Sequence, residues 1–200
     1  MRFFTGREIY NFMFDLTKHH IEKKLSQHKR ITLSREENRK ACVLVTLVNI
    51  EERLHLLLTK RTETVEHHKG QISFPGGMTD ESDASDTATA LREIEEEVGI
   101  PETMIEVLGV LDDIHIPSGF VVTPIVGYIE SLSELRTSTD EVAEVLLIPL
   151  ERFFDPALRR QEIRELKGIN RQVFVYDVWK EPVWGATAHI IKQFTDLVSS

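Results

Sequence analysis

Disulfides, long apolar runs and an excess of basic residues are all missing from this sequence of 200 residues. The single cysteine, Cys42, excludes an intrachain disulfide and fits a reducing compartment. No segment reaches the roughly 18 consecutive apolar residues that a membrane-spanning helix needs. The N-terminal segment carries Arg7, Glu8 and Asp15, where a signal peptide would be apolar. We therefore expect a cytoplasmic protein that does not enter a membrane.

The charge balance is acidic. Lysine and arginine number 24 against 33 aspartate and glutamate residues, which gives a formal net charge of −9. This argues against nucleic acid as a partner, because nucleic-acid-binding domains usually carry a basic patch. An acidic protein can still bind a phosphorylated small molecule if bound cations reverse the local charge. The composition thus leaves phosphorylated small molecules open as ligands.

The N-terminal part predicts helices. Apolar residues over 7–30 approximate a helical stripe, which indicates one or two helices before a polar link at 34–40. We expect residues 1–35 to form a helical extension that packs on the main domain, residues 36–200. A dimerisation arm is the alternative, so a homodimer stays open.

The remaining chain mixes strands and helices. Residues 41–50 are nearly all apolar or β-branched, which predicts a strand buried on both faces, and 54–60 predict its hairpin partner. We expect further strands at 105–112, 121–130, 144–148 and 173–179, short helices within 150–167, and a last helix over 186–198. Because strands and helices do not alternate regularly, this order favours a mixed sheet flanked by helices.

The most informative helix is predicted over 84–98, with Asp83 as its N-cap and Gly99 as its stop signal. Glu93, Glu96 and Glu97 are spaced i, i+3 and i+4, so their carboxylates share one face. Three like charges repel one another unless a cation lies among them, and oxygen ligands favour hard ions such as Mg²⁺, Mn²⁺ or Ca²⁺.

A solvated acidic face is the other interpretation of these glutamates. The upstream Pro75-Gly76-Gly77 favours a metal-binding face over a solvated one. Two glycines at the end of a regular element allow the backbone to approach a phosphate group closely. Together, the glycines and the acidic helix predict a metal-dependent phosphate site.

The stretch from Arg92 to Ile100 resembles the box of the Nudix hydrolases. That box reads Gly, five residues, Glu, seven residues, then Arg-Glu-apolar-X-Glu-Glu-X-Gly-apolar, and the second half matches without a gap. In the first half, Gly77 lies one residue too far from Arg92, and Asp83 occupies the position of the earlier Glu. The coenzyme A pyrophosphatase branch shows a similar Phe-Pro-Gly-Gly and longer spacing. The resemblance to this branch covers about residues 40–190.

The resemblance implies an α/β/α sandwich with a central mixed sheet and a site that binds Mg²⁺ or Mn²⁺. It assigns the metal to Glu93, Glu96 and Glu97, and gives Arg92 the task of fixing a glutamate rotamer. A downstream acid such as Glu141 or Glu144, or a carboxylate of the box, would deprotonate the water. The expected substrate contacts are Lys60, Arg61, His68, Gly76 and Gly77.

The function expected from this resemblance is hydrolysis of a diphosphate linkage. The first substrate is coenzyme A or an acyl derivative, cut to adenosine 3′,5′-bisphosphate and 4′-phosphopantetheine. Glu66 stands where the branch usually has Arg, so another nucleoside diphosphate derivative such as ADP-ribose remains the alternative. A non-catalytic binding module on the same scaffold is the third hypothesis.

Overall fold

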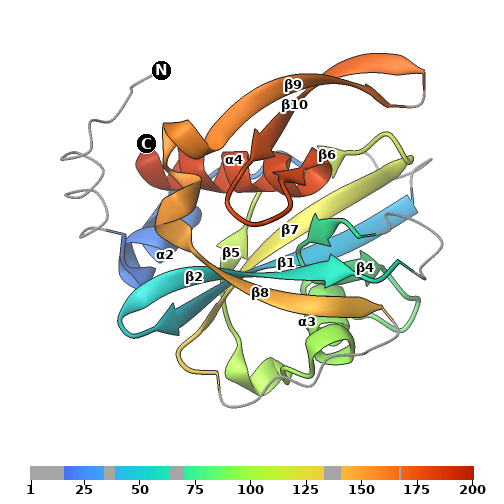
Figure 1. Ribbon diagram of the computed structural model, residues 1–200. Coiled ribbons are helices and arrows are strands. Elements are labelled where there is room, and N and C mark those ends of the chain that lie inside the picture. The colour runs from blue at the N-terminus through green and yellow to red at the C-terminus, as the bar shows by residue number, and fades with distance from the viewer. Residues whose placement is uncertain (1–15, 34–38, 64–69, 133–140, 167) are drawn as a thin grey trace.

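The computed structural model describes residues 16–33, 39–63, 70–132, 141–166 and 168–200. A mixed eight-stranded sheet forms the middle layer, with helix α3 (Asp86–Val98) on one face and helix α4 (Gly185–Ser199) on the other (Figure 1). This arrangement confirms the predicted α/β/α sandwich. Among the described residues, no helix is both long enough and apolar enough to cross a membrane.

The central sheet is built around one long strand. It has the order β3-β2-β1-β7-β5, with β4 added beside β1, β6 beside β7 and β8 beside β2. β1 runs parallel to β7 and antiparallel to β2, so the predicted mixed sheet is confirmed. The strands are β1 (Arg39–Ile50), β2 (Arg53–Arg61), β3 (Ile72–Ser73), β4 (Gly76–Met78), β5 (Glu106–Val110), β6 (Ile114–His115), β7 (Phe120–Ile129) and β8 (Val142–Pro149).

Both faces of β1 are buried, as its apolar run predicts. Val45 and Leu47 belong to the core beneath α4, whereas Leu44 and Val48 belong to the core beneath α3. Alternate side chains of a strand point to opposite faces, so a strand between two helical layers needs apolar residues at nearly every position. β1 therefore holds the two layers together and pairs with β4, which packs against α3.

The N-terminal extension is described from Leu16 onward and contains helix α2 (Lys18–Gln27). Thr17 caps the helix, and its two buried residues, Ile21 and Leu25, join the core that α4 covers. α2 packs against β5 and α4. The predicted helical residues 7–15 and most of the polar link, 34–38, lie outside the described residues, so the division at residue 35 stays a prediction.

Two adjacent aspartates, Asp112 and Asp113, accept hydrogen bonds from the chain that follows α2. Asp112 accepts a hydrogen bond from the Ile31 backbone N–H (2.7 Å) and contacts His28 Nε2 (2.8 Å). Asp113 accepts from Arg30 Nη2 (2.6 Å) and from the Leu33 backbone N–H (3.0 Å). These bonds tie the segment to the turn before β6.

The segment after β8 departs from its prediction in part. Short helices η2 (Leu150–Phe153) and η3 (Pro156–Leu158) form as expected, but residues 159–166 form a strand instead of helix. A second sheet has the order β11-β10-β9 and consists of β9 (Arg159–Leu166), β10 (Ile169–Tyr176) and β11 (Val183–Trp184). Charged residues dominate β9, so only its pairing with β10 makes it a strand, and pairing partners distant in sequence are invisible to local patterns.

Candidate active site

Helix α3 begins two residues later than predicted. Ser85 is its N-cap and accepts a hydrogen bond from the Ala88 backbone N–H (3.1 Å), so the prediction of Asp83 as the cap is wrong. Gly99 ends the helix in the left-handed conformation (φ 71°), as expected. Ala90, Ile94 and Val98 bury one face of α3 against the sheet. This packing fixes the rotation of the helix and with it the direction of every glutamate.

Pro75-Gly76-Gly77, expected to break the chain, leads directly into a strand. Gly76–Met78 form β4, which pairs with Ala41–Val43 of β1. A Cβ on Gly76 would lie 2.3 Å from the Cys42 carbonyl oxygen, so the strand can approach β1 only with glycine there. Pairing with β1 brings both glycines beside α3.

Glu97 is buried, whereas helical spacing alone does not distinguish it from Glu93 and Glu96. The residue is 5% exposed, and burial raises the pKa of its carboxyl group to about 8. Arg61 Nη1 lies 3.9 Å from Oε1, and the Gly76 backbone N–H also bonds to the carboxylate; both oppose this rise in pKa. Oε2 has no hydrogen-bond partner among the described residues. A buried carboxylate oxygen without a hydrogen-bond donor costs free energy, because nothing replaces the water that it loses on burial.

Glu93 lies directly against the second glycine. A Cβ on Gly77 would be 2.4 Å from Glu93 Oε1, so any other residue at position 77 would push the carboxylate away. Burial raises the pKa of Glu93, while Arg92 opposes the rise. The glycine pair therefore seats two carboxylates, with Glu93 against Gly77 and Glu97 bonded to Gly76.

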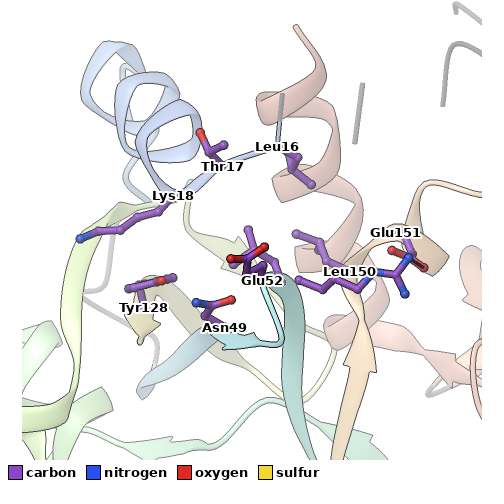
Figure 2. A pocket seen from close by; sticks show the side chains of 10 residues that line it. Leu16, Thr17, Lys18, Asn49, Glu52, Tyr128, Leu150 and Glu151 are labelled. Carbon is purple, nitrogen blue, oxygen red and sulfur yellow. Dashed lines mark ion pairs between the residues drawn. The ribbon is translucent and has the colours of Figure 1, made fainter. Parts of the chain in front are cut away.

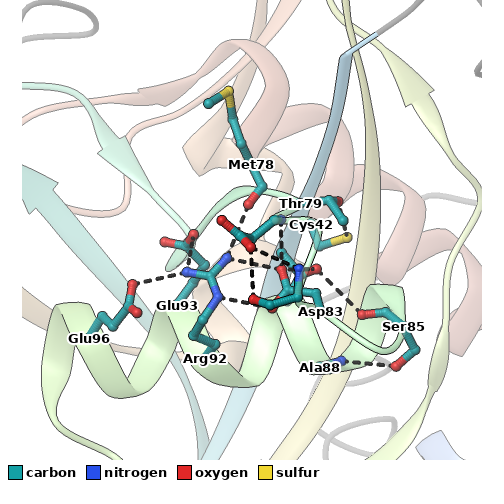
Figure 3. A network of polar contacts seen from close by, with 12 residues as sticks. Cys42, Met78, Thr79, Asp83, Ser85, Ala88, Arg92, Glu93 and Glu96 are labelled. Carbon is teal, nitrogen blue, oxygen red and sulfur yellow. Dashed lines mark hydrogen bonds and ion pairs between the residues drawn. The ribbon is translucent and has the colours of Figure 1, made fainter.

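Arg92 is the centre of a polar network on this side of α3. Figure 3 shows its guanidinium between Glu96 on one side and Asp83 on the other. Nη1 donates to Glu93 Oε1 (2.9 Å) and to Glu96 Oε2 (3.0 Å), and Nη2 donates to the Met78 carbonyl (3.1 Å). Asp83 takes the remaining two donors, at 3.0 and 3.1 Å. All donors of the side chain are thus used, which locks its orientation and that of Glu93.

The role of Asp83 was missed by the sequence reasoning. It is not a helix cap; its carboxylate is buried and accepts hydrogen bonds from Arg92, from the Thr89 hydroxyl (2.8 Å) and from the Asp80 backbone N–H (2.9 Å). Arg92 and these further donors hold the pKa of Asp83 well below its usual range. The signal that could have found it is its spacing, since Asp83 occupies the position of the earlier Glu of the box.

The three helix glutamates do not gather in one cluster. Glu93 and Glu97 lie beside the glycines, whereas Glu96 is exposed and turns toward Arg92. Among the described residues, no group of three or more His, Cys, Asp or Glu side chains is arranged to hold a metal ion. A metal that engages all three glutamates would therefore need Glu96 to change its rotamer.

The predicted substrate contacts fall on different sides of β2. Arg61 lies between Glu97 and Glu141, with Nη2 3.6 Å from Glu141 Oε2. Lys60 instead forms an ion pair with Glu181 (2.7 Å), in the chain that leads into β11. Neighbouring residues of a strand point to opposite faces, which explains the separation. His68, and Glu66 at the departure from the branch pattern, lie outside the described residues.

Comparison with known proteins identifies the family. A family model described as the NUDIX domain matches residues 38–167. This chain belongs to the Nudix hydrolase family. The uncharacterized Nudix hydrolase NudL of Pectobacterium atrosepticum is 41% identical over 165 residues, which cover 82% of this chain and 84% of that protein. NudL of Photorhabdus laumondii is 37% identical over 163 residues, which cover 82% of this chain and 87% of its own.

Solved structures of Nudix proteins share the fold. A MutT/nudix family protein from Enterococcus faecalis has a TM-score of 0.56 at 19% identity and covers 100% of this chain and 76% of its own. The NUDIX domain of Shewanella oneidensis NrtR, solved in complex with ADP ribose, has a TM-score of 0.53 at 16% identity. The match covers 96% of this chain and 98% of that domain. At such identities the likeness supports the architecture alone.

Nudix hydrolases generally use divalent metal ions such as Mg²⁺ or Mn²⁺, and the residues here fit such an ion. Glu97 Oε2 is buried without a hydrogen-bond partner among the described residues, and a positive ion would compensate it. Oxygen donors alone suit hard cations. Glu97 and Glu93, seated by the two glycines, would hold the ion.

A separate cavity lies far from this site. Its volume is about 540 Å³, and Figure 2 shows Lys18, Asn49 and Tyr128 among its lining residues. Asn49 and Ala41, which lies beside β4, are eight residues apart on β1, a distance of about 26 Å along a strand. The cavity is therefore separate from the carboxylates of the Nudix box.

Proposed function

We propose that this Nudix hydrolase cleaves the diphosphate of coenzyme A or an acyl derivative, with Mg²⁺ or Mn²⁺ as cofactor. The observation that supports metal-dependent chemistry is the buried carboxylate of Glu97, whose Oε2 has no hydrogen-bond partner among the described residues. The coenzyme A substrate rests on the sequence resemblance to that branch and on the Phe74-Pro75-Gly76-Gly77 segment. The products would be adenosine 3′,5′-bisphosphate and 4′-phosphopantetheine.

In the proposed mechanism, water attacks one phosphorus atom and the bridging P–O bond breaks, so the other phosphate leaves with the bond's electron pair. A divalent ion would neutralise charge at the diphosphate and lower the pKa of the attacking water. Glu93 and Glu97 would hold this ion, and Glu96 would join them only after leaving Arg92. Arg92 holds Glu93 in one rotamer, which preserves the alignment.

We assign acceptance of the water's proton to Glu141. Its side chain is 56% exposed, lies 3.6 Å from Arg61, and raises the pKa of both Glu93 and Glu97 through its charge. These contacts place a solvent-accessible carboxylate at the edge of the acidic group. Arg61 would pair with a phosphate of the substrate, and the backbone of Gly76 and Gly77 would lie beside the diphosphate. Lys60 would have to exchange Glu181 for a phosphate, and His68 remains a proposed contact.

ADP-ribose is the second candidate substrate, because Glu66 replaces the arginine that the coenzyme A branch usually has. A carboxylate there would repel a phosphate rather than bind it. The NUDIX domain of Shewanella oneidensis NrtR, which shares this fold, was solved in complex with ADP ribose, and this supports ADP-ribose as a candidate. A cytoplasmic location remains part of the proposal and rests on the single cysteine.

The test is product analysis with purified protein. Coenzyme A and ADP-ribose are incubated separately with Mg²⁺ or Mn²⁺, and products are separated by chromatography with mass detection. The proposal expects phosphopantetheine and faster turnover of coenzyme A; faster turnover of ADP-ribose would overturn the substrate assignment. Failure to hydrolyse any diphosphate with either metal would instead support the non-catalytic module. Glu95→Gln, on an exposed position of the same helix, is the matched control for Glu93→Gln and Glu97→Gln.

A further inference from the structure

The outer edge of strand β9 has no strand beside it in the described part of the chain. β9 pairs with β10 along its whole length, Arg159–Leu166, and ends the second sheet. Figure 1 shows strands β9 and β10 above α4, with one end of the strand pair extending beyond the layers of the domain. The free side of an edge strand presents a row of unpaired N–H and C=O groups, which can pair with another strand.

The backbone of β9 lacks the features that commonly block an edge strand. Natural edge strands are blocked by proline, by bulges, by short length or by charged side chains. The charged side chains Arg160, Glu162 and Arg164 of β9 form ion pairs with one another. β9 has eight residues, continuous register and no proline, and Ile163 near its centre is 75% exposed. That is the largest exposure of any large hydrophobic side chain among the described residues. An isoleucine in this position favours contact with a partner strand.

The charges on β9 are ordered along one face. Arg164 donates to Glu162 (2.8 Å), and Arg160 also forms an ion pair with Glu162. The Arg164 guanidinium lies over the ring of Trp184, 4.2 Å from its centroid, which restricts its freedom. A side chain held in this way loses little entropy when it meets a further carboxylate.

The backbone pattern limits which registers a second strand can take. Leu166 and Ile169 are opposite each other, so two residues separate these paired positions in the sequence. At such a separation the two flanking residues exchange backbone hydrogen bonds, and hydrogen-bonded pairs alternate with non-hydrogen-bonded pairs along the strands. Even-numbered residues from Arg160 to Leu166 therefore bond to β10. The odd-numbered residues between them direct their N–H and C=O groups to the open edge.

We propose that β9 pairs antiparallel with β9 of a second copy of this chain, about a twofold axis at Ile163. Outward-directed residues then face one another, and Ile163 lies opposite the partner's Ile163. Glu162 lies opposite the partner's Arg164, and twofold symmetry repeats this contact. Opposite charges and apolar pairs across strands are the contacts that stabilise a sheet.

Other registers that satisfy the backbone pattern are worse. A twofold axis at Glu162 places two glutamates opposite each other, and an axis at Arg164 does the same with two arginines, which destabilises a strand pair. An axis at Gln161 keeps a favourable charge pair but places Ile163 opposite the partner's Arg159. Of these registers, only the axis at Ile163 places the two isoleucines opposite each other and also pairs Glu162 with Arg164 of the partner.

The first experiment measures mass by light scattering or sedimentation equilibrium on the full chain. We expect the mass to rise toward twice 23.0 kDa as the concentration increases from about 1 to about 200 µM, a range suited to micromolar dissociation constants. Ile163→Lys should leave a monomer at every concentration, while Ile31→Lys, at another exposed isoleucine, should not change the association. A monomeric wild type, or a dimer indifferent to Ile163→Lys, would overturn the proposal.

The second experiment tests the register by exchanging charges. Arg164→Glu alone should weaken association at least tenfold, or about 1.4 kcal/mol, because Glu162 then meets a carboxylate of the partner. Adding Glu162→Arg to the same chain should restore association to within about threefold of the wild type. The thermal unfolding midpoint of each variant reports whether the hairpin survives. A double variant that stays dissociated while folded would reject the axis at Ile163.

A cysteine at the axis gives a geometric test. Residues in a hydrogen-bonded antiparallel pair have Cα atoms about 5.5 Å apart, within the range of about 4.4–6.8 Å that a disulfide spans. Oxidised Ile163→Cys should therefore run as a covalent dimer on a non-reducing gel, whereas Ile31→Cys should not. Native Cys42 is 1% exposed and does not compete. No cross-link at position 163 would contradict the proposed pairing.

Discussion

Glu97→Gln is expected to stabilise the metal-free protein while it strongly lowers the rate of hydrolysis. Glutamine has nearly the shape of a protonated glutamate but carries no charge to bury. The carboxyl of Glu97 has its pKa raised by burial from 4.5 to about 8. The folded state therefore retains a proton that the unfolded state releases, and this difference makes stability depend on pH.

The direction in which stability changes with pH follows from the protons that each state binds. Between pH 4.5 and about 8 the folded chain binds more protons at Glu97 than the unfolded chain does, so stability falls as pH rises through this window. With these pKa values, the destabilisation by Glu97 is about 1 kcal/mol at pH 5 and about 4 kcal/mol at pH 8. Glu97→Gln removes this destabilisation. The free energy of unfolding of the variant should therefore exceed that of the wild type by a margin that grows from pH 5 to pH 8.

The assay is urea unfolding in the presence of EDTA at both pH values, followed by circular dichroism. Glu95→Gln, exposed on the same helix, should differ from the wild type by less than about 0.5 kcal/mol at either pH. Mn²⁺ should raise the wild-type unfolding midpoint and affect Glu97→Gln far less, and diphosphate hydrolysis by the variant should fall at least about 10²-fold. If Glu97→Gln is no more stable than the wild type at pH 8, the account of an uncompensated carboxylate is refuted.

Three other substitutions test neighbouring parts of the site. Gly77→Ala should leave a folded protein whose hydrolysis rate falls at least about tenfold, because the new Cβ displaces the end of the Glu93 side chain from the orientation that Arg92 holds. Steady-state kinetics and the unfolding midpoint of the variant check this. Asp83→Ala should lower the free energy of unfolding by about 2–3 kcal/mol, since Arg92 loses two hydrogen bonds, whereas Glu81→Ala in the exposed loop should not. Arg61→Met should raise KM for coenzyme A more than Lys60→Met does, because Lys60 is already held by Glu181; equal effects would show that both lysine and arginine reach the substrate.

Much of the fold is visible in local sequence patterns. The β1–β2 hairpin, helix α3 with its glycine stop, and helix α4 all follow from apolar spacing and end signals, and the structure places their ends within two residues of prediction. The positions that went wrong depend on distant partners. β9 is charged along most of its length and becomes a strand through β10, and β4 forms because Gly76 permits close contact with β1.

The site shows the same division between local and distant causes. Helical spacing correctly puts Glu93, Glu96 and Glu97 on neighbouring positions, but it treats the three as equivalent. The structure separates them, because β4 covers one side of α3 and buries Glu97 while Glu96 stays in solvent. The side chain of Asp83 suits a helix cap, which is what its local sequence predicts. In the structure it instead accepts hydrogen bonds from Arg92, nine residues away.

The sequence by itself determined which residues are available for chemistry: a helix with three glutamates on one face and an arginine, two consecutive glycines before it, and a long apolar strand beside them. These are consequences of side-chain type and spacing over a few residues. Only the tertiary structure decided which carboxylate loses its water, what holds the arginine, and which edge of a sheet is left open. Those outcomes depend on packing between segments far apart in the chain, where burial and hydrogen bonding change the free energy of each group.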